Sequence, residues 1–103
     1  MKTTDIEAIL GNTLNISELT LTNDNNRLKL SLAILREDSV LKIEFHNVHS
    51  LKIEGVSWPF EIDGIAITDH HKDGWEKHSR YHVYDFEDGK VSFFCEGFNA
   101  IDE

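Results

Sequence analysis

Apolar and polar residues alternate along most of this chain, which is the two-residue period of a β-strand buried on one face. The expected strands run over residues 14–21, 28–34, 40–54 and 62–67. A break in phase at Ser17-Glu18 predicts a bend or bulge in the first of them, and Gly64 predicts a bulge in the last. The long third stretch is either one bent strand or two strands with a corner at residues 47–50.

The pattern also predicts a β-hairpin over Tyr81–Glu96. Asp88-Gly89 separates its two apolar-rich segments, and this dipeptide is typical of a two-residue primed turn. With that turn, Tyr84 would face Phe93 and His82 would face Cys95. The face expected to be buried then comprises Tyr84, Phe86, Val91, Phe93 and Cys95.

One short helix is expected at the start of the chain, because Thr4 and Glu7 have the spacing of a capping box and Gly11 stands where the helix would end. Polar turns separate the strands, among them a turn at Asn23-Asp24-Asn25-Asn26, whose side chains tolerate a left-handed backbone, and none of the connections has the helical length that a parallel crossover needs. The fold class is therefore mainly β: an antiparallel, strongly curled sheet, a half-barrel or small sandwich, of about six to seven strands with one short N-terminal helix. The 103 residues form a single domain, 1–103.

The charge of the chain is strongly acidic and uneven. Nineteen acidic and ten basic residues give a net charge of −9, and residues 61–103 hold eleven acidic and four basic residues, a net −7. Such a field repels nucleic acid and anionic membranes and would speed encounter with a basic partner. A simpler explanation is that acidic surfaces keep small proteins soluble. The sequence shows neither a signal peptide nor a membrane-spanning stretch, so we expect a cytoplasmic protein.

The candidate chemistry in the sequence is weak. Six histidines invite a metal hypothesis, but they lack a recognised ligand spacing, so we expect no metal and no cofactor. A thiolate–imidazolium couple between His82 and Cys95 is conceivable across the hairpin, although Cys95 on an apolar face is better explained as a small buried hydrophobe. Without a phosphate-binding loop or catalytic signature, the sequence predicts a protein that is not an enzyme.

Several stretches together resemble a known group of proteins. They are Leu41–Val48, Gly64–Asp69, Gly74–Glu76, Arg80–Asp85 and Val91–Cys95. Their pattern is similar to that of small all-β bacterial domains of the immunity-protein type from polymorphic-toxin systems, over about two thirds of the chain. The resemblance implies a protein that binds and neutralises a cognate toxin in the cytoplasm, and it carries over no catalytic residue.

These observations favour a non-enzymatic binding module, an immunity-type inhibitor that covers a basic toxin by charge-steered occlusion. The residues expected to contact the partner are Glu61, Asp63, Asp69, Asp73, Trp75, Glu76, Asp85, Glu87 and Asp88. Two alternatives stay open: a small-ligand or metal-binding β domain, and a structural or oligomeric subunit with an apolar patch around Val83 and Phe94. The sequence leaves the oligomeric state undecided, and a homodimer is possible.

Overall fold

The computed structural model describes residues 3–55, 57, 60–70, 79–85 and 89–102. The elements are α1 (Thr3–Leu10), β1 (Leu14–Asp24), β2 (Arg27–Leu35), β3 (Val40–Ile53), β4 (Phe60–Ile62), β5 (Ile65–Asp69), β6 (Tyr81–Asp85), β7 (Val91–Cys95) and β8 (Gly97–Asp102). The strands follow the spatial order β4-β1-β2-β3-β7-β6-β5, and β8 also pairs with β3. Every pairing is antiparallel.

The mainly β, antiparallel class with one short N-terminal helix is confirmed. The sheet has eight strands in the described part of the chain, is not closed, and curls only weakly as a whole, so it is more open than a half-barrel. The helix in the described residues is too short to cross a membrane.

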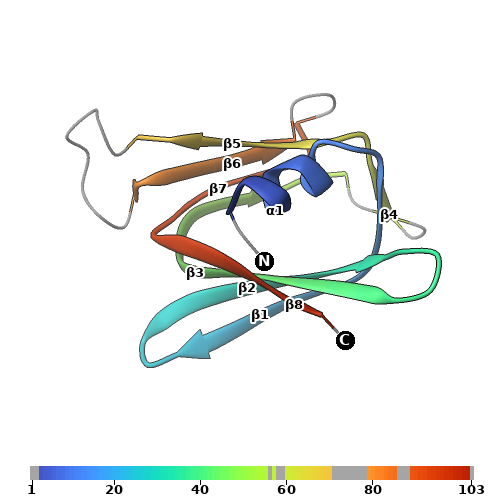
Figure 1. Ribbon diagram of the computed structural model, residues 1–103. Helices are drawn as coiled ribbons and strands as arrows, with labels where there is room; N and C mark the ends of the chain where they lie inside the picture. The colour runs from blue at the N-terminus through green and yellow to red at the C-terminus, as the bar shows by residue number, and fades with distance from the viewer. Residues whose placement is uncertain (1–2, 56, 58–59, 71–78, 86–88, 103) are drawn as a thin grey trace.

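β3 connects two parts of the sheet. One part comprises β4, β1, β2 and β8, and the other comprises β7, β6 and β5. Its first part pairs with β2 and β8, from Leu41 opposite Asp102 to His46 opposite Gly97, and its second part pairs with β7. The strand continues through two irregular positions, Asn47 and Ser50, which both have φ of 55°. The stretch 40–54 is therefore one bent strand, the first of the two expected alternatives, and Figure 1 shows it curving from the β1–β2 side to the β7 side.

The local signals of the first hairpin are also confirmed. The register of β1 against β2 shifts between Ile16 and Glu18, where the break in phase predicts a bulge. Asn25 and Asn26 form the tight turn between the two strands with φ of 55° and 65°, which asparagine tolerates better than most residues. The Asn23 side chain accepts a hydrogen bond from the Asn26 backbone N–H at 2.9 Å.

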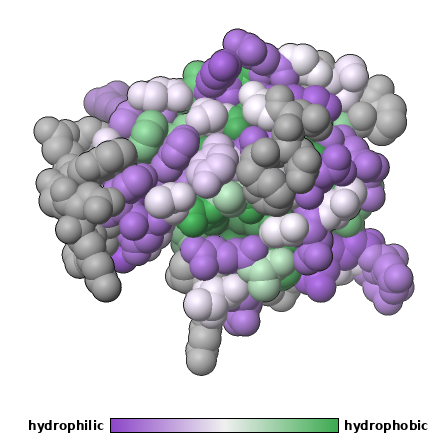
Figure 2. Space-filling view, turned by 90° about the horizontal axis from the view of Figure 1, so that it is seen from above, coloured by the Kyte–Doolittle hydropathy of each residue, from purple (hydrophilic) through white to green (hydrophobic). Residues whose placement is uncertain are grey.

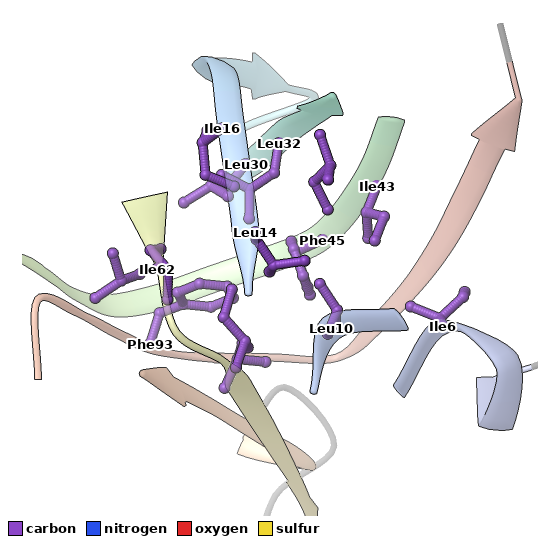
Figure 3. Packing of buried hydrophobic residues seen from close by; sticks show 14 of the residues in the cluster. Ile6, Leu10, Leu14, Ile16, Leu30, Leu32, Ile43, Phe45, Ile62 and Phe93 are labelled. Carbon is purple, nitrogen blue, oxygen red and sulfur yellow. The ribbon is translucent and has the colours of Figure 1, made fainter. Parts of the chain in front are cut away.

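The apolar faces of both parts of the sheet enclose one core. Figure 3 shows Ile6 and Leu10 of α1 together with residues of β1, β2, β3, β4 and β7 around the same interior. Phe45 of β3 and Phe93 of β7 meet there edge to face, with ring centroids 5.0 Å apart. Helix α1 contacts β5 and β8, so it packs against both parts of the sheet.

Three expectations about the strands were wrong. The stretch 62–67 is two strands: β4 pairs with β1, whereas β5 pairs with β6, and the chain changes partner at Gly64, where φ is 151°. Glycine permits that angle because it lacks a Cβ atom. β8 was not anticipated at all.

The register of the second hairpin was the third error. His82 faces Phe94 and Tyr84 faces Ser92, so the pairing is shifted by one residue from the one that a two-residue turn predicts. Because side chains alternate across a strand, this shift moves Tyr84 to the outer face and Val83 to the core, where Val83 is fully buried. Phe86 lies outside the described residues. The patch expected around Val83 and Phe94 is therefore divided between two faces of the sheet.

Candidate functional site

The carboxylates expected to bind a partner lie at opposite ends of β5. Glu61 of β4 and Asp63 just after it are exposed and precede β5, and Asp69 is the last residue of β5 and also exposed. Asp73, Trp75, Glu76, Glu87 and Asp88 lie outside the described residues. The described carboxylates thus form two separate groups.

Asp69 is already engaged within the chain. The Arg80 guanidinium donates two hydrogen bonds to it, Nε to Oδ1 and Nη2 to Oδ2, both at 3.1 Å. This hydrogen bonding raises the pKa of Arg80, and the guanidinium also lies 4.8 Å from the centre of the Tyr81 ring. Part of the negative charge at this end of β5 is therefore neutralised locally.

Asp85 differs from the other carboxylates because it is buried, with 4% of its surface exposed. It ends β6 on the core-facing side, where its Oδ2 atom accepts a hydrogen bond from the Lys90 backbone N–H at 3.4 Å. This hydrogen bond links the end of β6 to the residue before β7. The buried carboxylate presents little surface to another molecule.

The outer face of β3, β7 and β6 carries a row of four rings that we call the ring ladder: His49, Phe94, His82 and Tyr84. The Phe94 ring is stacked against His49 on one side, with centroids 5.5 Å apart and planes at 17°, and against His82 on the other, at 4.6 Å and 14°. Tyr84 follows His82 at 4.7 Å. All four side chains are half-buried.

Hydrogen bonds fix the two imidazoles of the ring ladder. His49 Nε2 is bonded to Ser79 Oγ at 2.9 Å and its Nδ1 to Ser50 Oγ at 3.1 Å, while His82 Nε2 is bonded to Ser92 Oγ at 3.2 Å. Burial lowers the pKa of His82, and the neighbouring His70 lowers it further. The His82 imidazole is therefore held in a neutral state near pH 7.

Sequence reasoning missed the ring ladder because its members come from three strands. The alternation of His82 with Tyr84 and of Ser92 with Phe94 is visible in the sequence, but the wrong register placed Tyr84 on the core face. His49 could not be assigned to the same face without the irregular backbone of β3.

The proposed couple between His82 and Cys95 is excluded by the register. Cys95 faces Tyr81 and is fully buried in the core, whereas His82 lies on the outer face. Burial raises the pKa of the Cys95 thiol to about 12, so the thiolate is not formed near neutral pH. Cys95 is the small buried hydrophobe that its sequence context favours.

In the described residues, the side chains that could hold a metal are not grouped together, and two surface hollows are each formed by one short stretch of chain. Within them, no group of three or more His, Cys, Asp or Glu side chains is placed to hold a metal ion. Two surface hollows lie beside the β1–β2 turn and at the Arg36–Ser39 turn, and each is lined by one local segment of chain. Neither brings together polar groups from distant elements, as a built binding pocket does.

Comparison with known proteins defines the class. A family-model match places the chain among the immunity proteins, a class whose members act as inhibitors of toxins and are typically not enzymes. Residues 6–101 match the model of the family described as Immunity protein PIM8, and the chain belongs to this family. No curated protein and no solved structure gives a significant match. Membership of an immunity-protein family implies that the chain binds a toxin.

Proposed function

We propose that this protein inhibits a basic toxin in the cytoplasm by covering the toxin's active region, and that its negative charge speeds the encounter. The family membership supports the inhibitor role, and the net charge of −9 supports a basic partner. On this mechanism the protein performs no chemistry of its own, and inhibition is steric.

The acidic groups at the two ends of β5 are the proposed steering residues. Glu61 and Asp63 are exposed, and Asp69 retains an exposed edge beside Arg80. We also include Asp73, Trp75, Glu76, Glu87 and Asp88, which follow β5 and β6 in the sequence. Asp85 is assigned a structural role in the hairpin because of its burial.

The test is the association rate with an inactive variant of the toxin encoded beside this protein's gene. Reversing the charges in Glu61→Lys/Asp63→Lys should slow association about tenfold at low ionic strength, with little change in dissociation, because steering acts on the encounter. High salt should remove the difference.

The matched control is Glu37→Lys/Asp38→Lys, which makes the same change in net charge in the exposed turn between β2 and β3. Equal slowing by both variants would mean that net charge alone matters and would refute the assignment to the ends of β5. Failure of the unaltered protein to bind the toxin, or to protect cells that express the active toxin, would refute the inhibitor role itself.

A further inference from the structure

Strand β1 has an outer edge that the rest of the sheet covers only in part. β4 pairs with residues Leu14–Ile16 of β1, and within the described residues no strand pairs with this edge beyond them. Figure 1 shows β1 along the lower edge of the sheet. The outward backbone N–H and C=O groups of such an edge are a template for a further extended strand.

The turn between β1 and β2 fixes which backbone groups point outward. Its two central residues both have positive φ, and the residues on either side, Asp24 and Arg27, are paired. They form the first hydrogen-bonded pair of the hairpin, because the carbonyl of the first residue of a β-turn accepts the N–H of the fourth. Bonded and non-bonded pairs then alternate along the two strands.

This alternation assigns the residues of β1 to two sets. Thr22 and Thr20 belong to bonded pairs with β2, so their backbone groups point towards β2. Leu19, Leu21 and Asn23 belong to non-bonded pairs, and their N–H and C=O groups point towards the open edge. Another strand can therefore bond to these three residues without breaking a bond inside the protein.

One face of this edge is apolar and incomplete. Leu21 lies opposite Leu30, which is fully buried, yet Leu21 itself is 48% exposed. Leu19 lies opposite the buried Leu32 on the same face and packs against the core while only partly buried. A strand added beside β1 would extend the sheet over both exposed leucine side chains, which favours an occupant with apolar residues in the same alternation.

The edge has few of the features that keep edge strands apart. Residues 17–23 contain no lysine, arginine or proline, and their one charged residue, Glu18, accepts a hydrogen bond from the Thr20 hydroxyl at 2.8 Å. At the other end of the strand order, helix α1 contacts β5; Figure 2 views that side and shows hydrophobic atoms near the middle with hydrophilic ones around them. A single charge gives the β1 edge no preference for a basic partner.

We propose that β1 pairs with β1 of a second copy of the chain, antiparallel and around a twofold axis at Thr20. Thr20 then faces its counterpart, Leu19 faces Leu21 on both sides of the axis, and Glu18 faces Thr22. Leu19 and Leu21 make the intermolecular hydrogen bonds, since their backbone groups point outward. This inference goes beyond the proposed inhibition of a toxin and does not depend on it.

Charge and the position of β4 select this register. An axis at Leu21 would place Glu18 opposite Asp24, and like charges directly opposite each other are destabilising. With the axis at Thr20, the pairing spans residues 17–23 and ends before Ile16, where β4 occupies the edge.

The register is tested by oxidative cross-linking of Thr20→Cys, with Thr22→Cys as the matched control on the same face. Facing Thr20 positions form a non-bonded pair, whose Cα atoms lie about 4.5 Å apart, within the range of a disulfide. The two Thr22 positions would lie roughly 13 Å apart along the strands, which is too far. We expect Thr20→Cys to form linked dimers about tenfold faster or more. Cys95 is fully buried and should not interfere.

Sedimentation of the full chain tests the dimer itself. The average mass should rise towards twice that of the monomer with increasing concentration, and more so at high salt, because each copy carries a net charge of −9 and salt screens their repulsion. Leu21→Pro removes an N–H that points outward, a position where edge strands tolerate proline. It should abolish the rise in mass and leave the circular dichroism spectrum unchanged.

Several outcomes would overturn the proposal. They are a monomer at every concentration and salt, equal cross-linking by the two cysteine variants, and self-association that a folded Leu21→Pro variant retains. Hydrogen exchange provides the last test. Protection of the Leu19 and Leu21 amides that appears only with the inactive toxin, and not with increasing protein concentration, would assign this edge to a strand of the toxin instead of a second copy.

Discussion

Burial and a neighbouring histidine both oppose the protonation of His82. Its ring is stacked on Phe94 and lies beside Tyr84, and this burial lowers its pKa; His70 lowers the pKa further by charge repulsion. A histidine whose pKa is depressed in the folded protein takes up its proton more readily when the chain is unfolded. The free energy of unfolding is thus unaffected at high pH and falls as the pH drops through the unfolded value near 6.5.

We expect the His82 ring protons to titrate in nuclear magnetic resonance spectra with a midpoint below 6.5. His70→Gln should move this midpoint upward, because it removes the neighbouring side chain that lowers the pKa of His82. His82→Gln should also reduce the loss of stability on acidification between the unfolded and folded pKa values of His82. A midpoint at or above that of a free histidine would contradict the burial of this ring.

At the level of single elements, the irregular backbone of β3 determines which side chains share a face. Asn47 and Ser50 both adopt a left-handed conformation inside the strand, and the register against β7 shifts between His49 and Lys52. Left-handed geometry is tolerated by asparagine and costs more for a serine. Ser50 is thus a position where the strand bears a local strain that allows His49 to stack on Phe94.

The test at this position compares Ser50→Val with Ser50→Ala. Both remove the hydroxyl that bonds His49, but the branched valine side chain is less compatible with positive φ. We expect Ser50→Val to lower the free energy of unfolding by about 1–2 kcal/mol more than Ser50→Ala, measured by urea denaturation. Equal values for the two variants would show that the backbone at this position relaxes without cost.

The sequence predicted the elements whose signals are local. The asparagine turn, the bulge near Ser17 and the alternation of β1, β2 and β3 each depend on a few adjacent residues, and all were confirmed. β8 was missed because Gly97 and Asn99 interrupt its apolar pattern and its partner, β3, lies far away in the sequence. The predicted register of the second hairpin was wrong by one residue, since Asp88-Gly89 alone does not determine the loop length.

In the candidate site, too, only the residues with local sequence signals could be predicted. Exposed carboxylates such as Glu61 and Asp63 could be proposed from turn composition, because turns lie at the surface. Asp85 could not be recognised as buried until the correct register placed it on the core face. The ring ladder depends on three strands and on two left-handed residues, and therefore on long-range pairing that periodicity does not encode.

For the whole molecule, β3 is the strand shared by both parts of the sheet, so we expect the two parts to unfold together. It pairs with β2 and β8 in its first part and with β7 in its second, and Phe45 on this strand contacts both Phe93 and Phe98. A loss of packing at Phe45 should consequently weaken both parts of the sheet and not one alone.

Phe45→Leu should lower the free energy of unfolding by about 1–2 kcal/mol, since it leaves a small cavity at a fully buried position. In native-state hydrogen exchange, protection should fall by the same amount in β1–β2 and in β6–β7. Leu21→Ala, at a position 48% exposed, is the control and should change protection little. A loss of protection confined to one pair of strands would show that the two parts open independently.

The position of β3 also has a consequence for the rate of folding. Ile43 pairs with Ala100 and His49 pairs with Phe94, so these contacts close long loops of chain and place the fold among those that form in roughly milliseconds to seconds. The stack of His49 on Phe94 therefore exists only once β7 has paired with β3, and the outer face of this part of the sheet is assembled by long-range pairing.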